Sequence, residues 1–293
     1  MVFIPQSEIR NPKSFMPELP EVETMRRGIA AIAGGRVTEV ERLRCPRKLI
    51  LISPRIDSCR RRIVGRRISS VDRAGKRVVL RFDTGDALVI EPRMTGLVLV
   101  ANPPDPLYLR LRLAVEGSQL REFYYWDRRG LGCVRLFSSD EFDAAFGPEK
   151  LGPDALAMTA DLYRERLGGS RRAIKVALLD QRAVAGIGNL YASEVLHVAG
   201  VHPAVRCSSL SRKRWAAIAE AAHLVLCDAI EHEGSTLGDG TYRNALNESG
   251  GYQNHHRVYD RAGKACPRCS AQIVRSVQAQ RSTFYCPACQ NRR

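Results

Sequence analysis

The pattern of hydrophobic and polar positions changes character along the chain. A helical period comes first, because apolar residues recur every three or four positions after Pro20 and stop before Gly34-Gly35: Val22, Met25, Ile29 and Ile32. From residue 37 to residue 137 the apolar residues stand in short β-branched runs between turn residues, as in KRVVLRF, DALVIE and GCVRLF. We therefore expect residues 16–150 to form an antiparallel β-sandwich or barrel that begins with one leading helix.

After residue 150 the period becomes helical again. Helical spacing with glycine stops marks four segments: MTADLYRERLG, RRAIKVALLDQR, NLYASEVLHVAG and SRKRWAAIAEAAHLVLCDAIEHEG. Residues 236–262 are rich in Gly, Asn and polar groups, which favours a long loop. The pattern therefore predicts an α+β protein of two domains, with a helical domain over residues 151–262 and a small cysteine module over 263–293.

The cysteine module has the spacing of a metal site. CPRC at 266–269 and CPAC at 286–289 give C-x2-C-x16-C-x2-C, with strand-like runs QIVRSV and STFYC between the pairs. Four thiolates complete a tetrahedral shell around Zn²⁺, and no position remains for a substrate. We therefore expect a zinc ribbon with one structural zinc, held by Cys266, Cys269, Cys286 and Cys289. Two redox-active dithiols are the alternative.

The charge balance indicates a polyanionic partner. Lys and Arg number 46 against 31 Asp and Glu, a formal net charge of +15, and such a surplus favours nucleic acid ahead of an anionic membrane. No apolar segment is long enough to span a bilayer, and MVFIPQSEIRNPKSF lacks the apolar centre of a secretory signal. The other five cysteines are scattered, which argues against a disulfide framework and for a reducing cytoplasm.

Three sequence blocks carry a resemblance to a known family. With MPELPEVE at 16–23, LLDQRAVAGIGNLYASEVL at 178–196 and QRSTFYCPACQ at 280–290, the chain resembles the formamidopyrimidine-DNA glycosylases. The resemblance implies a bacterial, cytoplasmic, monomeric DNA-repair enzyme that binds damaged double-stranded DNA. Such an enzyme excises oxidised purines and then cleaves the strand by β,δ-elimination. It also implies a helix–two-turn–helix in the helical domain, and Leu19 favours the purine-specific branch over the pyrimidine-specific one.

Within this resemblance, Pro17 takes the position of the nucleophile. A free secondary amine can attack the deoxyribose C1′ and form an iminium that serves as an electron sink. An amide nitrogen cannot, because its lone pair is in resonance with the carbonyl. We therefore expect translation to start at Met16, so that the extension 1–15 is absent from the mature protein and Met16 is removed. The alternatives are a turn proline before a helix, and a lesion-binding protein without lyase activity.

The resemblance assigns three further catalytic residues. Glu18 matches the acid that protonates the deoxyribose or the leaving base, and its alternative is a first-turn glutamate that favours the helix dipole. Lys76 matches a lysine that contacts phosphate beside the lesion and assists β-elimination. Arg281, near the tip of the zinc hairpin, matches an arginine that binds phosphates and serves δ-elimination. For both basic residues, a solvated surface charge is the alternative.

Another set of matches concerns the space that a flipped base leaves in the duplex. Met94 in EPRMTG corresponds to the family's wedge methionine. In WDRRGLG, Arg129 corresponds to the arginine that faces the orphaned base, and Leu131 stands where the family usually has phenylalanine. Core packing is the alternative for Met94 and Leu131.

The GIGN segment at 186–189 joins two predicted helices. Asn189 begins the second of them, where exposed N–H groups and the helix dipole are expected to attract a DNA phosphate. Lys175 on the preceding helix matches a phosphate-contacting lysine, and Arg171 is expected one turn earlier on that helix.

Three departures from the family pattern indicate a divergent branch. Glu91-Pro92-Arg93 stands where His-Leu-Gly is usual, a histidine expected near residue 107 is missing, and Gly130 replaces a second arginine. These departures bear on substrate preference, so an oxidised-pyrimidine glycosylase is the alternative activity.

Overall fold

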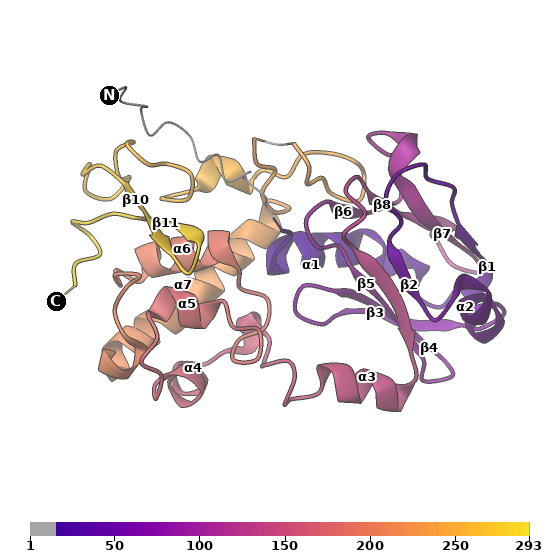
Figure 1. Cartoon of the computed structure of the whole chain (residues 1–293), viewed down its shortest axis with the longest axis horizontal. Coiled ribbons are helices and arrows are strands. Elements are labelled where there is room, and N and C mark those ends of the chain that lie inside the picture. Colours follow the sequence, from indigo (N-terminus) through magenta and orange to yellow (C-terminus); the bar gives the residue numbers. More distant parts are fainter. Residues whose placement is uncertain (1–15, 239, 293) are drawn as a thin grey trace, which may run out of the picture.

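The computed structural model describes residues 16–238 and 240–292, so the predicted extension 1–15 lies outside the described residues. Figure 1 shows a β-rich part and a helical part side by side, with α1 (Leu19–Gly28) between them. This is the predicted leading helix, and Val22 and Met25 on its apolar face are fully buried, as is Ile29 directly after it. α1 packs against strands of both sheets and against the longest helix of the helical domain, and its apolar residues belong to one large cluster that the two parts share.

The β-rich part is the predicted sandwich. One sheet has four strands in the order β1 (Arg36–Arg42), β7 (Leu109–Glu116), β8 (Glu122–Asp127) and β6 (Gly96–Leu99). The other has five in the order β2 (Leu51–Ser53), β9 (Cys133–Phe137), β5 (Ala87–Glu91), β4 (Val78–Phe82) and β3 (Ile68–Arg73). All pairs within these two sheets are antiparallel except β2 with β9, which run parallel.

Besides the predicted leading helix, this domain contains two short helices that the sequence analysis did not identify. α2 (Ile56–Ile63) follows β2, and α3 (Ser139–Phe146) follows β9. α2 buries only Cys59 and Ile63 among a run of arginines, too few apolar positions for a helical period to stand out. α3 does carry a sequence signal, because the Ser138 hydroxyl accepts the Glu141 N–H and the Glu141 carboxylate accepts the Ser138 N–H.

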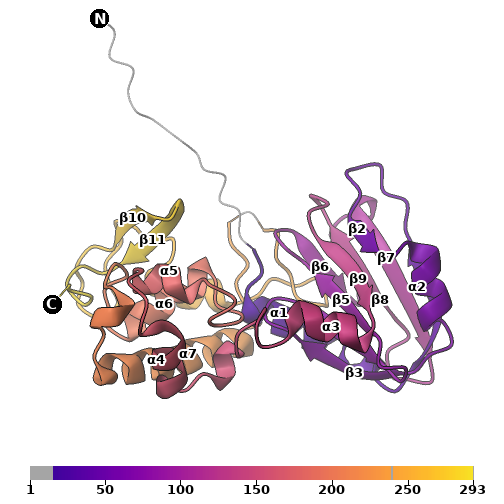
Figure 2. The same cartoon turned by 60° about the horizontal axis from the view of Figure 1, so that its bottom comes forward.

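The helical part contains α4 (Ala160–Leu167), α5 (Ile174–Leu178), α6 (Asn189–Val198) and α7 (Arg212–Glu231). α7 packs against α1, α4 and α6, as Figure 2 shows from a second direction. Short 3-10 helices lie between the longer elements: η1 (Ala30–Ile32), η2 (Pro106–Tyr108), η3 (Ala155–Ala157), η4 (Cys207–Ser209) and η5 (Tyr252–His255). The last lies within the predicted loop 236–262.

α5 is shorter than its sequence pattern predicts, and Arg171 is not part of it. The Arg172 carbonyl accepts the Cys207 N–H, and Ala173 forms a β-bridge with Arg206. This extended pairing holds residues 172–173 out of helical geometry, so the helix begins only at Ile174. The expectation that Arg171 and Lys175 share one helix was therefore wrong.

The C-terminal module is the predicted two-stranded hairpin, formed by β10 (Val274–Gln278) and β11 (Arg281–Tyr285). Ala279 and Gln280 make the turn, with positive φ values of 46° and 61°. Its apolar core comprises only Val258, Cys266, Ile273, Phe284 and Cys286. Among the helices that the structure describes, none is both long and apolar enough to cross a membrane.

Candidate active site and DNA-contacting surface

The Glu18 carboxylate lies at the N-terminus of α6. It is 3% exposed and accepts hydrogen bonds from the backbone N–H groups of Gly188 at 2.7 Å, Leu190 at 2.9 Å and Tyr191 at 3.3 Å. The expectation that the N–H groups of this turn are exposed and attract a DNA phosphate was therefore wrong. A carboxylate of the chain's own N-terminal helix occupies the anion site, where the helix dipole stabilises negative charge.

The Lys76 ammonium lies beside this carboxylate. A Cβ placed on Gly188 would be 2.3 Å from the Glu18 carboxyl carbon and 2.6 Å from Lys76 Nζ. Gly188 therefore leaves the space in which the two charged groups meet. Burial raises the pKa of Glu18, and the positive charge of Lys76 lowers it in part. Burial likewise lowers the pKa of Lys76, opposed by the charge of Glu18.

Glu21, one turn further along α1, is hydrogen-bonded to three segments of the chain. Its carboxylate accepts the Tyr191 hydroxyl at 2.6 Å, the Ser235 N–H at 2.9 Å and the Glu18 N–H at 2.9 Å. Burial raises the pKa of Glu21 to about 7. No local pattern distinguishes Glu21 from the other acids of α1, because only the tertiary structure brings Tyr191 and Ser235 to it.

Pro17 immediately precedes Glu18 and is buried, whereas Met16 is 41% exposed. The backbone here is fixed by the Leu19 N–H, which donates to the Gly186 carbonyl at 3.0 Å. The structure therefore brings the predicted nucleophile and the predicted acid to the same place, between α1 and the GIGN segment.

Met94 and Arg129 lie on two neighbouring loops. Met94 is half-buried, Arg129 is exposed, and an Arg129 guanidinium nitrogen is 3.6 Å from Met94 Sδ. Leu131 is also half-buried on the second loop, so neither apolar residue belongs to the closed core.

The buried Asp127 carboxylate joins these two loops. It accepts the Thr95 hydroxyl, next to Met94, and the N–H groups of Arg129 at 3.1 Å and Gly132 at 2.8 Å. Sequence reasoning missed Asp127, because one acid within WDRRGLG cannot be told from a solvated charge. The departure at Gly130 also has a structural cause: its φ is +62°, and a Cβ there would lie 2.3 Å from the Lys48 carbonyl oxygen.

Lys175 and Asn189 attach the helical domain to the ribbon. Lys175 is 1% exposed, and its Nζ donates to Asn189 Oδ1 at 2.7 Å, the Ser282 carbonyl at 2.9 Å and Thr283 Oγ1 at 2.7 Å. Asn189 Nδ2 also donates to the Ser282 carbonyl, at 3.0 Å. Burial lowers the pKa of Lys175 to about 7. Both side chains thus hold the strand that begins at Arg281, which is exposed, whereas Arg171 is an exposed residue ahead of α5.

The four cysteines of the ribbon have the arrangement of a zinc site. Their Sγ atoms all lie within 4.8 Å of one another, with Cys269 and Cys286 at 3.5 Å and Cys266 and Cys289 at 3.9 Å. Tetrahedral Zn–S bonds of about 2.3 Å require S···S separations of roughly 3.8 Å, which fits. The chain therefore holds one structural zinc and leaves it no open position.

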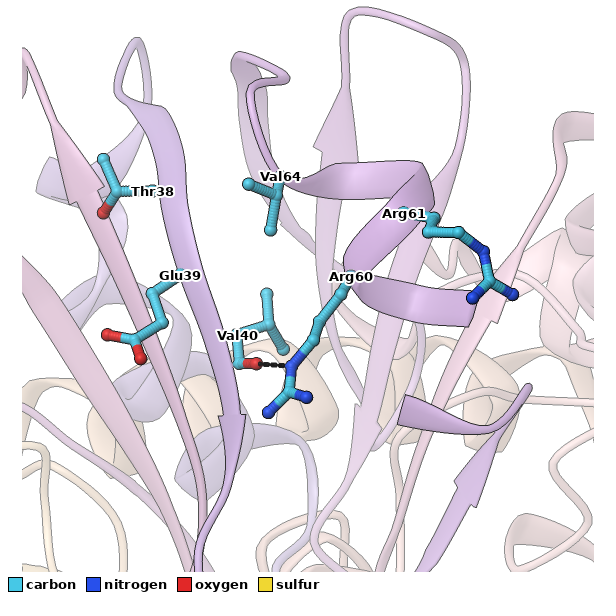
Figure 3. Close-up of a pocket in the computed structure, with 6 residues that line it drawn as sticks. All are labelled: Thr38, Glu39, Val40, Arg60, Arg61 and Val64. Atoms are coloured by element: carbon cyan, nitrogen blue, oxygen red, sulfur yellow. Dashed lines mark hydrogen bonds between the residues drawn. The ribbon is translucent and has the colours of Figure 1, made fainter. Parts of the chain in front are cut away.

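One surface hollow lies away from the site. A shallow hollow of about 500 Å³ lies between β1 and α2, where Arg60 Nε donates to the Val40 carbonyl at 2.7 Å (Figure 3). Its lining residues are Thr38, Glu39, Val40, Arg60, Arg61 and Val64. None of the buried carboxyl groups described above belongs to it.

A β-sandwich, a helical domain and a zinc ribbon that together surround buried carboxyl and ammonium groups define a DNA-processing protein. Comparisons with known proteins specify the family. The N-terminal domain of formamidopyrimidine-DNA glycosylase matches residues 16–134, its H2TH domain matches 147–240, and the zinc finger found in FPG and IleRS matches 263–292.

Relatives of known name match nearly the whole chain. The formamidopyrimidine-DNA glycosylase of Chloroflexus aggregans is 42% identical over 279 residues, which is 94% of this chain and 98% of the relative. That of Caulobacter vibrioides is 36% identical over 297 residues, 94% of this chain and all of the relative.

Comparison with solved structures points to the same family. The Fpg protein of Thermus thermophilus superposes with a TM-score of 0.80 at 34% identity, covering 94% of this chain and 100% of the other. Lactococcus lactis Fpg, solved with DNA containing an abasic site, gives a TM-score of 0.80 at 30% identity, covering 94% and 99%. The chain belongs to the formamidopyrimidine-DNA glycosylase family.

Proposed function

We propose that this base-excision-repair enzyme removes oxidised purines, such as 8-oxoguanine and formamidopyrimidines, with the Pro17 amine as nucleophile. The buried Glu18 carboxyl beside Pro17 carries this proposal. Three backbone N–H groups hold that carboxyl in place, and burial raises its pKa, which suits a group that transfers a proton.

In the proposed reaction, the Pro17 nitrogen attacks the deoxyribose C1′ of a flipped nucleotide. The bond from C1′ to the base breaks, and Glu18 supplies a proton to the sugar oxygen or to the base as the ring opens. Loss of that oxygen's bond to C1′ leaves an iminium, which accepts the electrons of the successive β- and δ-eliminations of the flanking phosphates. Lys76, beside Glu18, serves the first elimination, and Arg281 at the hairpin serves the second.

DNA binding is assigned to the remaining predicted residues. Met94, Arg129 and Leu131 fill the space left by the flipped nucleotide, because they lie together on two adjoining loops. Lys175 and Asn189 act near the phosphates through the strand they hold, and Arg171 adds an exposed charge. The partner is damaged double-stranded DNA. The enzyme acts as a monomer in the bacterial cytoplasm, at the nucleoid.

The proposed domain limits are 16–150, 151–262 and 263–293, and the mature chain starts at Pro17. Matches to relatives support this start, since the N-terminal family model begins at residue 16. Pro17 has a free amine only if residues 1–16 are absent, because a peptide nitrogen is not nucleophilic.

Borohydride trapping tests the nucleophile. Protein starting at Pro17 and protein starting at Met1 are each incubated with an 8-oxoguanine duplex and sodium borohydride. We expect a covalent adduct only with the Pro17 start, attached at Pro17 by mass spectrometry. Equal trapping of both proteins, or attachment elsewhere, would contradict the proposal. If neither protein is trapped while both bind the duplex, the chain is a lesion-binding protein.

A panel of lesion duplexes tests the substrate class. We expect excision of 8-oxoguanine and formamidopyrimidine to be at least about tenfold faster than excision of oxidised pyrimidines, a difference of about 1.4 kcal/mol in barrier. The reverse order would make the chain an oxidised-pyrimidine glycosylase.

A further inference from the structure

A second group of metal-ligating side chains lies apart from the four cysteines, at the C-terminal end of α7. Asp228 lies in the last turn of α7, His232 caps the helix four residues later, and His255 comes from η5. One ligand atom from each of the three lies within 4.8 Å of the other two. Neither the proposed chemistry nor the proposed DNA contacts use these residues.

The three side chains are held in orientation by their neighbours. His232 Nδ1 is 2.8 Å from the Asp228 carbonyl oxygen and 3.2 Å from Asp228 Oδ1. The two imidazole rings are 3.9 Å apart between centroids, and the buried Tyr252 ring lies parallel to that of His255, with centroids 6.2 Å apart and planes at 10°. The Tyr252 ring thus lies beside both histidines.

The donor set selects a class of ion. Two imidazoles and one carboxylate are ligands for Zn²⁺, Co²⁺, Ni²⁺ or Cu²⁺, whereas Mg²⁺ and Ca²⁺ require mostly oxygen ligands. The carbonyl end of α7 adds the negative pole of the helix dipole. We propose that Asp228, His232 and His255 bind a second divalent transition-metal ion, whose remaining coordination positions are filled by water.

Arg257 modulates this site. A guanidinium nitrogen is 3.6 Å from Asp228 Oδ2, while Oδ1 of the same carboxylate faces His232. Arg257 therefore orients the carboxylate, but its positive charge opposes a cation. The second site consequently binds its ion more weakly than the four thiolates bind zinc.

The ion would join the two ends of a loop. His232 directly follows α7, and its carbonyl accepts the Gly251 N–H at 2.7 Å, while the Tyr252 N–H donates to the Gly234 carbonyl at 3.0 Å. The segment between these contacts carries Ser235, which binds Glu21. Binding therefore stabilises the base of a loop that reaches the active-site carboxyls, and metal should raise the melting temperature of the folded protein.

Metal stoichiometry tests the proposal independently of activity. Full-length protein with its cysteine site loaded with zinc is equilibrated with Zn²⁺ in moderate excess, passed through a desalting column in zinc-buffered solution, and measured by atomic emission. We expect two equivalents per chain in the wild type and one in His255→Ala. His255 is exposed, so its removal leaves the fold intact. His232→Ala should lose the same equivalent.

His223→Ala is the matched control, because His223 is an exposed histidine on α7 outside the cluster, and it should retain two equivalents. Co²⁺ added to the zinc-loaded wild type should give d–d absorption without the thiolate charge-transfer band of a cysteine site. A wild type that retains a single equivalent, or a His255→Ala variant that retains two, would overturn the proposal.

Discussion

The sandwich domain and the zinc ribbon become ordered by different means, although each supplies part of the proposed active site. The sandwich shares a large apolar cluster with α1 and the helical domain, whereas the ribbon's own cluster has five buried residues, two of them metal ligands. A core that small cannot offset the entropy of ordering the segment, so metal binding contributes the folding free energy.

This difference extends to the charged groups that each region carries. Glu18 and Lys76 are enclosed at the domain junction. Burial raises the pKa of Glu18 and lowers the pKa of Lys76, so it favours the neutral form of each group. Arg281 stands exposed at the hairpin turn. A buried acid or base suits proton transfer, because its surroundings can bring its pKa close to the working pH. An exposed arginine suits phosphate binding, because its guanidinium stays charged.

The largest expected effect separates the two regions directly. Cys266→Ser removes one of four zinc ligands, so the ribbon should unfold while the sandwich keeps its stability within about 0.5 kcal/mol. Affinity for a lesion duplex, measured by fluorescence anisotropy, should fall at least about 100-fold, or roughly 2.7 kcal/mol. Cys227→Ser is the control, because Cys227 is a half-buried cysteine on α7 outside the zinc site. Unchanged affinity in Cys266→Ser would refute a ribbon that depends on metal.

Substitution of the buried Glu18 should slow the chemical steps and leave DNA affinity nearly unchanged. Glu18→Gln removes the proposed proton donor, so single-turnover base excision should slow by about 10²–10³-fold. Strand cleavage at a preformed abasic site should slow less, because no base has to leave. Duplex affinity, measured alongside, should stay within about threefold. Equal losses in both reactions would remove the special role of Glu18 in base release.

The pH dependence of stability should distinguish the buried carboxyl from ordinary surface acids. Glu21 has a pKa of about 7 in the folded protein against a reference value of 4.5, so the folded state binds more protons between these pH values. Its contribution is therefore full below pH 4.5 and is lost as the pH rises through 7. The loss of stability between pH 5 and 7 should be roughly 2–3 kcal/mol smaller in Glu21→Gln than in the wild type.

Denaturant unfolding of both proteins at each pH measures this difference. The window ends at pH 7 because Lys175 has its own lowered pKa of about 7 and contributes with the opposite sign above it. Parallel pH profiles of the two proteins would contradict the assignment.

The smallest effects concern the joint between the Met94 and Arg129 loops. Asp127→Asn replaces one acceptor oxygen with a donor, which can deprive the Gly132 N–H of its acceptor at a cost of about 1–3 kcal/mol, whereas the Arg129 N–H keeps the Thr95 hydroxyl oxygen. Thr95→Val removes the hydroxyl that donates to Asp127 and accepts the Arg129 N–H, but the carboxylate still accepts both N–H groups, so the cost should be about 1 kcal/mol. Calorimetric unfolding gives both values. If Thr95→Val cost more than Asp127→Asn, the hydroxyl rather than the carboxylate would hold the loops together.

Much of this architecture could be predicted from local patterns. Period-two apolar runs identified the strands, glycine stops bounded the long helices, and the cysteine spacing identified the ribbon. Each of these features depends only on residues that are close together in the sequence. α2 escaped prediction because its arginines leave only two buried positions, Cys59 and Ile63, and Arg171 was misplaced because a distant strand-like pairing shortens α5.

Local residue patterns were enough to specify the zinc ligands, the two-domain order and the motif that contains Pro17 and Glu18. What those residues contact became known only from the packing of the folded chain. Glu18 and the α6 N-terminus are about 170 positions apart in the chain, as the separations of their hydrogen bonds show, and Asp127 binds a threonine 32 positions away. Hydrogen bonding and burial depend on which distant segments pack together, and short stretches of sequence do not encode that packing.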